Sequence, residues 1–389
     1  MLRGWRRRLL LVLVVMIAAA FAIAPGYVDG DMNRVLTTTP PAPSAAALAL
    51  HHQLFVADLH ADQLLWARDP LRRASRGHVD VPRLQDGNVA LQVFSVVTKT
   101  PRGINYDLNT DETDNILLLA IAQRWPVATW RSLRARALHQ ADRLHQAARR
   151  SEGALTVVGT QTELRAFVQR RAVQPTLVAG VLAIEGLHAL DGRLENVDTL
   201  FAAGFRMMGL THFFDNALGG SAHGVSHAGL TPFGRDVVTR MERLGIIVDL
   251  AHTSPQMKLD VLAMATRPVV VSHGGVAATC PGPRNLTDEQ LRAIAANGGL
   301  VGIGYWDGAV CEMTVPSIVK AIRHAVTVMG IEHVALGSDF DGATMEPWDT
   351  RALALVTEGL LQNEFSPDDV RRIMGGNVLA FLASQLPAQ

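Results

Sequence analysis

The sequence predicts a (β/α)8 barrel of the TIM type. Eight apolar runs with strand character recur along the chain, and segments with helical periodicity separate most of them. Most runs close on a histidine or an acidic residue, or are followed by one, and the carboxyl ends of barrel strands all face one mouth. The runs end near residues 60, 97, 186, 212, 252, 273, 305 and 340.

The composition bounds the class of protein. The chain has 389 residues, 48% hydrophobic and 19% charged, which suits one large α/β domain or two medium ones. Because 36 basic residues balance 36 acidic ones, nucleic acid is not expected as a partner. A doubly wound open sheet is the alternative fold, disfavoured because no glycine-rich dinucleotide fingerprint follows the first run.

The N-terminus has the pattern of an export signal. Four arginines within the first eight residues precede sixteen apolar residues, 9–24, so a cleaved signal and an uncleaved membrane anchor both remain open. The arginines predict that the rest of the chain lies on the periplasmic or extracellular side. We assign residues 1–25 to this signal or anchor, 26–50 to a flexible tether rich in Pro, Thr, Ala and Ser, and 51–389 to the main domain.

The first predicted strand, within LFVADLHADQL, brings His60 and Asp62 to its end. Residues two apart on a strand share a face, so these two side chains can bind one ion together. The second run, residues 88–99, carries no such residue. Residues 111–152 have helical spacing, and the short run 155–160 is expected to be a strand of a side hairpin.

The next two runs end in Glu185 and His212. An acid at the end of an otherwise aliphatic strand is costly to bury unless it meets a cation, which makes Glu185 informative. A salt-bridged or helix-capping carboxylate is the less favoured interpretation. The long glycine-containing loop after His212 lies where substrate contacts tend to occur in a barrel.

A strand, a helix and a strand follow over residues 245–275, and the two strands end in His252 and His273. In such a unit both strands point the same way, so both imidazoles emerge at the same end of the sheet. One histidine at a strand end is more often a satisfied polar residue than a ligand, but two at matching positions favour a site. The last run, residues 333–342, carries Asp339 and Asp341 near its end.

These side chains converge at the mouth of a barrel and together predict a metal site. Mixed nitrogen and oxygen donors without thiolate suit zinc, with manganese, cobalt or iron as substitutes. The donors outnumber what one tetrahedral ion needs; they are His60, Asp62, Glu185, His212, His252, His273 and Asp339.

The two cysteines, Cys280 and Cys311, bear on the compartment. In an exported chain a disulfide between them is favoured, since the surroundings are oxidising. Two unpaired buried thiols are the alternative.

Seven motifs in this order resemble the membrane (renal-type) dipeptidases, the M19 metallopeptidases of the amidohydrolase superfamily: DLHAD, IEG, LTHFFDN, IIVDLAH, PVVVSH, RNLTD and ALGSDFDG. The resemblance covers roughly residues 54–380. It implies a metallo-dipeptidase with a binuclear zinc centre at the carboxyl-terminal mouth of the barrel. The substrate would be a dipeptide, including those with a C-terminal D-residue, or a related small amide.

The resemblance also implies a role for each ligand. His60 and Asp62 would hold the first zinc ion, His252 and His273 the second, and Glu185 would bridge both. A hydroxide shared by the two ions would be the nucleophile, because metal binding makes water acidic near neutral pH.

Three further residues match the family in position. His212 would polarise the scissile carbonyl, and Asp339 would pass the proton from water to the leaving amine. Arg284 would bind the free carboxylate of the substrate, a task that suits its planar fork of donors. The family also carries a disulfide before this arginine, so Cys280 and Cys311 are predicted to be bonded.

Two other functions stay open on the sequence alone. The same metal site would serve another amide, a lactam or an ester as substrate. A non-enzymatic exported binding protein is disfavoured because every metal position and both proton-handling positions are filled. The sequence does not fix whether the chain forms a homodimer, and the membrane is a partner only if residues 9–24 stay attached.

Overall fold

The computed structural model describes residues 2–389 and contains a parallel barrel. Nine strands form one sheet in the order β2-β1-β9-β8-β7-β6-β5-β4-β3, and an additional pairing of β2 with β4 closes eight of them into the predicted barrel. The strands are β1 (Val56–Ala61), β2 (Val89–Phe94), β3 (Leu155–Val157), β4 (Val178–Ile184), β5 (Phe205–Gly209), β6 (Ile247–Asp249), β7 (Val270–Gly274), β8 (Leu300–Ile303) and β9 (Val334–Leu336).

The ninth strand, β3, lies outside the closed ring. It pairs with β4 in parallel, so the prediction of a side hairpin over residues 155–160 is wrong. The physical reason is the connection: helix α6 joins the two strands, and a helical crossover returns the chain in the same direction.

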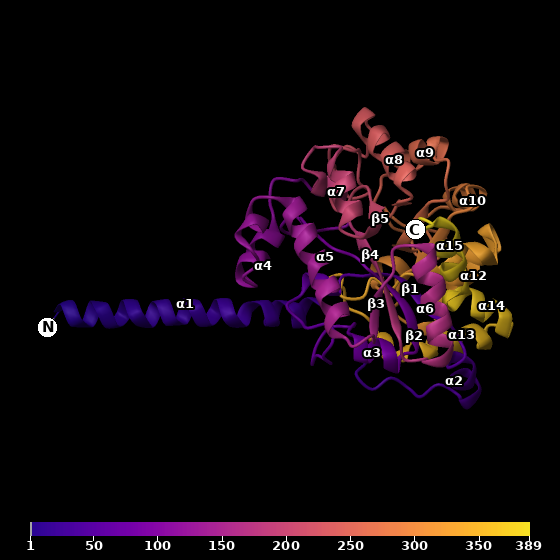
Figure 1. The fold of residues 1–389 in the computed structure, drawn as a ribbon, viewed down its shortest axis with the longest axis horizontal. Helices are drawn as coiled ribbons and strands as arrows, with labels where there is room; N and C mark the ends of the chain where they lie inside the picture. The colour runs from indigo at the N-terminus through magenta and orange to yellow at the C-terminus, as the bar shows by residue number, and fades with distance from the viewer. Residues whose placement is uncertain (1) are drawn as a thin grey trace.

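Helices cover the barrel between successive strands (Figure 1). They are α1 (Leu2–Met32), α2 (Ala45–His51), α3 (Val81–Asp86), α4 (Asn115–Ala122), α5 (Leu133–Arg150), α6 (Gln161–Val173), α7 (Asn196–Ala202), α8 (Pro232–Leu244), α9 (Pro255–Met264), α10 (Asp288–Ala296), α11 (Asp307–Val310), α12 (Val315–Met329), α13 (Ala354–Gln362), α14 (Pro367–Arg371) and α15 (Asn377–Gln385).

Local sequence signals set several of these helix boundaries. At the start of α10 the side chain of Thr287 accepts from the backbone N–H of Gln290, and the Gln290 side chain accepts from the Thr287 N–H in return. Ser366 and Asp369 form the same reciprocal cap before α14. Such capping boxes satisfy backbone donors that a helix end leaves free.

The strands bury both faces, as expected for a parallel barrel. Along β1, Ala57 and Leu59 belong to a core cluster that includes residues of α6 and α15. Asp58 and His60 share the other face, where the Asp58 carboxylate accepts from Gln92 of β2 and from the Ser338 N–H, each at 3.0 Å. This alternation carries His60 toward the mouth.

Helix α1 projects from the barrel as one long helix, and α4 packs beside its inner end (Figure 1). Within it, Arg8–Met32 is long and apolar enough to cross a membrane, although a signal sequence meets the same test. The helix runs on beyond residue 25, and the chain after it bonds to the barrel: Val35 bridges Glu346, and the Leu36 N–H donates to the Glu346 carbonyl at 2.9 Å. The domain boundaries at 25 and 50 stay a prediction.

Candidate metal centre

The predicted ligands fall into two positional classes. His60 and His273 lie within β1 and β7, and Glu185 directly follows β4. His212, His252 and Asp339 lie in the loops, each three positions beyond the last residue of β5, β6 and β9 (Gly209, Asp249 and Leu336).

The loop positions differ from the sequence prediction, which put these residues on strand ends. The backbone gives the reason, because His252 and Asp339 have φ angles of 61° and 62°. This left-handed conformation cannot continue an extended strand, so neither residue can belong to the strand before it. The turn aims the side chain over the mouth of the barrel.

Glu185 is at the centre of the cluster. Its Oε1 lies 2.7 Å from His252 Nε2 and 3.1 Å from His273 Nε2. Its Oε2 lies 3.2 Å from His212 Nε2 and 3.8 Å from His60 Nε2. One carboxylate therefore touches imidazoles from four different strand ends.

A second group forms around His60. Its Nε2 lies 3.5 Å from an Asp62 oxygen and 3.8 Å from an Asp339 oxygen. The buried donors fall into three overlapping sets whose atoms lie within 4.8 Å of one another: His60, Glu185 and His273; Glu185, His212 and His252; His60, Asp62 and Asp339. All predicted ligands are thus brought together, and Glu185 and His60 each belong to two sets.

The donor set fits a metal ion. Five of its buried atoms have no hydrogen-bond partner among the described residues: His60 Nε2, Asp62 Oδ1, Glu185 Oε1, His212 Nδ1 and His252 Nδ1. The Nε2 atoms of His252 and His273 face each other at 3.1 Å. Buried polar atoms without partners are costly, whereas a cation between them satisfies the nitrogen and oxygen lone pairs together.

The acidic groups are strongly coupled to the imidazoles. Burial would lower the pKa of His60, but the carboxylates of Asp62, Glu185 and Asp339 outweigh it and raise this pKa to about 10. Burial would raise the pKa of Glu185, yet the surrounding imidazoles hold it well below its usual value. Burial raises the pKa of Asp339 well above the usual value, and the carboxylates of Glu185 and Asp62 add to the effect.

The pKa values of the other imidazoles are lowered, which favours the neutral form that binds metal. Burial lowers the pKa of His252 well below its usual value, and the positive charge of Arg284 adds to this. His273 shifts in the same direction because of burial, His60 and Arg284.

Ser272, which precedes His273 in the PVVVSH motif, was missed at the sequence level. Its hydroxyl lies 2.9 Å from His273 Nδ1 and 3.3 Å from His60 Nδ1. It is therefore placed to orient both rings through the nitrogen that faces away from the cluster, as outer partners of metal-binding histidines do. A serine in an apolar strand is too common a feature to signal this role.

Arg284 is buried beside the cluster. One Nη donates to the His273 carbonyl at 3.0 Å, and the guanidinium lies 5.1 Å from the centre of the Trp306 ring. The predicted disulfide between Cys280 and Cys311 is present, and it ties the loop that carries Arg284 to the end of α11.

A cavity of about 890 Å³ opens over the cluster. This volume is typical of small-molecule sites. Its polar floor includes Asp62, Glu185, His212, His252, Arg284 and Asp339.

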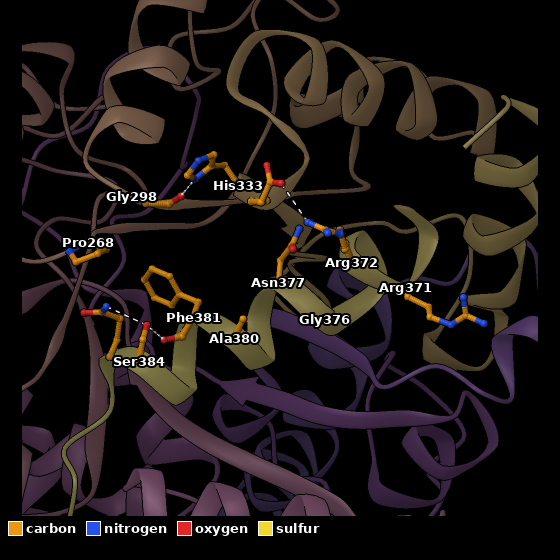
Figure 2. A pocket seen from close by; sticks show the side chains of 13 residues that line it. Pro268, Gly298, His333, Arg371, Arg372, Gly376, Asn377, Ala380, Phe381 and Ser384 are labelled. Carbon is orange, nitrogen blue, oxygen red and sulfur yellow. Dashed lines mark hydrogen bonds and ion pairs between the residues drawn. The ribbon is translucent and has the colours of Figure 1, made fainter. Parts of the chain in front are cut away.

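A second cavity, of about 490 Å³, lies at the opposite end of the barrel, where β7, β8 and β9 begin (Figure 2). Its polar side chains already have protein partners. His333 Nδ1 lies 2.7 Å from the Gly299 carbonyl, and Arg372 pairs with Glu332 at 3.1 Å. The mouth cavity is therefore the candidate site.

A closed parallel barrel with buried imidazoles and carboxylates at its carboxyl-terminal mouth defines a metal-dependent hydrolase. Residues 44–385 match the model of the membrane dipeptidases, peptidase family M19. The chain therefore belongs to this family, as its motifs predicted, and it is a metallo-dipeptidase.

Individual relatives agree with this assignment. The dipeptidase tcpJ of Claviceps purpurea is 29% identical over 79% of this chain and 69% of its own. The solved structure of the metallopeptidase dipeptidase AC is 25% identical, with a TM-score of 0.69 over 86% of this chain and 99% of that one. A Rhodobacter sphaeroides metallopeptidase, solved with a phosphinate mimic of the dipeptide L-Ala-D-Ala, shares the fold at 24% identity, with the same TM-score and coverage.

Proposed function

We propose that the chain is an exported dipeptidase that uses two zinc ions held around Glu185. In this proposal His60 and Asp62 hold one ion, His252 and His273 hold the other, and Glu185 bridges them. The main support is the position of Glu185. Its two oxygens lie within 3.8 Å of ring nitrogens of His60, His252 and His273, which come from both proposed ligand pairs.

The ions, when bound, would supply a nucleophile derived from water and polarise the peptide carbonyl. Within the protein, His212 lines the cavity, and its Nε2 lies 3.2 Å from Glu185. From there it would donate to the oxygen that becomes negative as the peptide bond is attacked. Asp339, also on the cavity floor, would accept the water proton and deliver it to the leaving amine, a transfer that its raised pKa favours.

Arg284 would select substrates that end in a free carboxylate. One of its donors is engaged by the His273 carbonyl, which fixes the guanidinium and leaves further donors for a ligand in the cavity. A carboxylate is the natural partner of this fork. The relative solved with an L-Ala-D-Ala mimic supports including a D-residue at the C-terminal position.

Export and anchoring complete the proposal. The apolar α1 helix supports an anchor or signal, and the disulfide supports an oxidising compartment. Finding the protein in the membrane fraction with an intact N-terminus would support the anchor, whereas a mature form that lacks residues 2–24 would contradict it.

The function is tested on the full chain in detergent, loaded with zinc. The substrates are a dipeptide with an L-residue at the C-terminus, its D counterpart, its C-terminal amide, a tripeptide, a lactam and an ester. We expect hydrolysis of the two free-carboxylate dipeptides and weak or no turnover of the others. Turnover of the lactam, the ester or the blocked amide without turnover of dipeptides would favour the alternative amidohydrolase.

A further inference from the structure

One wall of the active-site cavity comes from the N-terminal helix. Beyond the polar floor the cavity is lined mainly by apolar side chains, and one side of it is formed by α1. The contributing residues recur at helical spacing, so they share one face of the helix: Phe21, Ala24, Pro25, Val28 and Met32. Residues of α4, among them Ile116 and Leu119, line the facing side.

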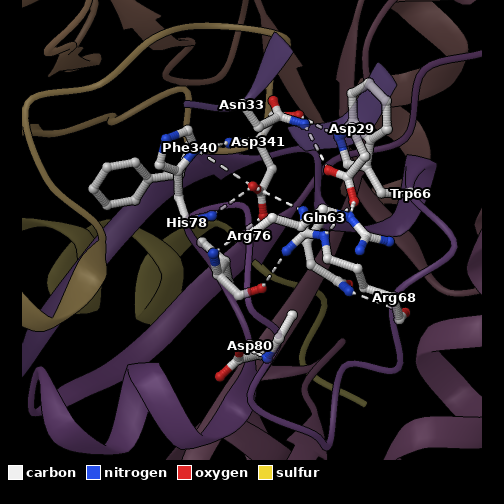
Figure 3. Close-up of polar contacts among 12 residues, drawn as sticks. Asp29, Asn33, Gln63, Trp66, Arg68, Arg76, His78, Asp80, Phe340 and Asp341 are labelled. Atoms are coloured by element: carbon white, nitrogen blue, oxygen red, sulfur yellow. Dashed lines mark hydrogen bonds and ion pairs between the residues drawn. The ribbon is translucent and has the colours of Figure 1, made fainter. Parts of the chain in front are cut away.

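A buried ion pair fixes this part of α1 to the barrel (Figure 3). Asp29, only 1% exposed, accepts from Arg68 Nε at 3.0 Å and from Arg76 Nε at 2.8 Å. Its second oxygen accepts from the Asn33 side chain at 3.0 Å. A charge this deeply buried is stable only with such partners, so the end of α1 is held in one place.

The same ion-pair network connects α1 to the loop that carries Asp339. Arg68 also pairs with Asp341 at 2.8 Å, and Asp341 accepts from the backbone N–H groups of His78 and Val79 at 2.7 and 3.1 Å (Figure 3). A single residue, Arg68, connects Asp29 of α1 to Asp341 of this loop. Ion pairs therefore connect the apolar wall of the cavity to the loop that carries Asp339 of its polar floor.

The size of the cavity exceeds what a small dipeptide needs. A volume of about 890 Å³ is of the order that holds a drug-sized ligand. The polar floor provides for a peptide bond and a carboxylate, which leaves the apolar space between α1 and α4 for another part of the substrate. Apolar surface gains free energy by covering apolar surface, so this space favours a large hydrocarbon or aromatic group.

We propose that residues 21–32 of α1 contact the substrate, and that their apolar face selects dipeptides that carry a large apolar side chain. This inference rests on the proposed dipeptidase function. It assigns the N-terminal helix a role in specificity besides any role in export or anchoring.

Adjacent residues of α1 offer a matched test. Val28 faces the cavity, whereas Tyr27 is 73% exposed and does not line it. In the zinc-loaded full chain in detergent, we compare Val28→Asn with Tyr27→Asn on Ala-Ala and on Phe-Phe. The wild type should show the higher kcat/KM on Phe-Phe. Val28→Asn should raise KM for Phe-Phe about tenfold, which is the usual effect of losing an apolar pocket contact. The same variant should change KM for Ala-Ala by less than about twofold. Tyr27→Asn should change neither.

A second variant guards against a folding defect. Val28→Phe keeps the helix apolar and narrows the apolar part of the cavity, so it should also raise KM for Phe-Phe and leave KM for Ala-Ala nearly unchanged. Binding of phosphinate mimics of the same two dipeptides, measured by calorimetry, should follow the same pattern without turnover.

The outcomes separate this inference from the function on which it rests. If Ala-Ala and Phe-Phe are cleaved equally well, or if both Val28 variants affect the two substrates alike or not at all, the dipeptidase function stands and the role of α1 is overturned. If the loaded enzyme cleaves no dipeptide, both proposals are overturned.

Discussion

Two buried polar clusters meet in the loop after β9, and they are built in opposite ways. In the cluster of Asp29, Arg68 and Asp341 every charge lies against an opposite charge. In the cluster around Glu185 several donor atoms face one another without hydrogen-bond partners among the described residues. The paired cluster is balanced by its own ion pairs and ties α1 to the barrel, whereas the unpaired donor atoms around Glu185 suit a cation.

Asp339 and Asp341, two positions apart, show the difference most directly. Burial would raise the pKa of both carboxyls. For Asp341, Arg68 and His78 outweigh burial and hold the pKa below its usual value. For Asp339, the carboxylates of Glu185 and Asp62 add to burial, and the pKa lies well above the usual value. The environment alone keeps one aspartate a structural anion and favours the protonated form of the other.

Breaking the unpaired cluster should have the largest effect, and that effect should fall on activity. Glu185→Gln keeps the size of the side chain but removes the bridging charge. We expect kcat/KM for a dipeptide to fall about a thousandfold or more, because metal-assisted catalysis supplies several kcal/mol. Steady-state assays measure this, with the exposed Glu195→Gln as control. A variant with more than a tenth of wild-type activity and full metal content would contradict the bridge.

Breaking the paired cluster should instead reduce stability. Arg68→Met leaves Asp29 and Asp341 buried with a partner removed, and such losses cost about 3–5 kcal/mol of unfolding free energy. Urea denaturation measures the change. The matched control is Arg72→Met, since the Arg72 side chain is 87% exposed. Equal stabilities of the two variants would mean that the ion pairs do not hold the loop and α1 in place.

Arg284 combines features of both clusters. It is buried and bonded to the protein like Arg68, yet it keeps free donors for a ligand. Arg284→Lys retains the charge but loses the planar fork. We expect KM for dipeptides to rise about 10- to 100-fold, the value of a charged hydrogen bond, with a smaller change in kcat. A dipeptide amide, which lacks the carboxylate, should be nearly unaffected. An equal rise for both substrates would remove Arg284 from carboxylate recognition.

Lys258 is a buried basic residue outside both clusters, and its amine donates to the Thr253 carbonyl. Burial and Arg284 lower its pKa to about 7, against the opposing effect of Asp249. Between pH 7 and the unfolded value of about 10.4 the unfolded chain binds more protons than the folded one. Stability contributed by this group therefore rises with pH in that window, by at most about 1.4 kcal/mol per unit.

Denaturation curves at pH 7 and pH 9 check this dependence. Lys258→Met should remove most of the rise, and Lys320→Met, at an exposed position, should keep it. If the stability of Lys258→Met still rises between pH 7 and pH 9, the pH dependence belongs to another group.

The sequence predicted the barrel, and the convergence of the candidate ligands at its mouth, because the signals for both are local. Apolar runs separated by helical patterns predict parallel strands, and His60, Glu185 and His273 stand where such runs end. The left-handed turns at His252 and Asp339 were not predictable, because neither residue type requires a positive φ. The strands were therefore expected to reach these residues, whereas they stop earlier.

The N-terminal wall could not be predicted for a different reason. Asp29 follows an apolar run, and the nearby residue that bonds to it, Asn33, carries no charge. Its partner Arg68 lies 39 residues away and connects to Asp341 near the end of the barrel. Such contacts depend on how the barrel closes, which no local pattern records.

The central claim is that the cluster around Glu185 holds two ions. The direct measurement is the metal content of the purified full chain after zinc loading and dialysis, by elemental mass spectrometry against protein concentration. We predict close to two zinc ions per chain in the wild type, and one or fewer in Glu185→Gln. A wild-type content of one ion or none would contradict the binuclear site.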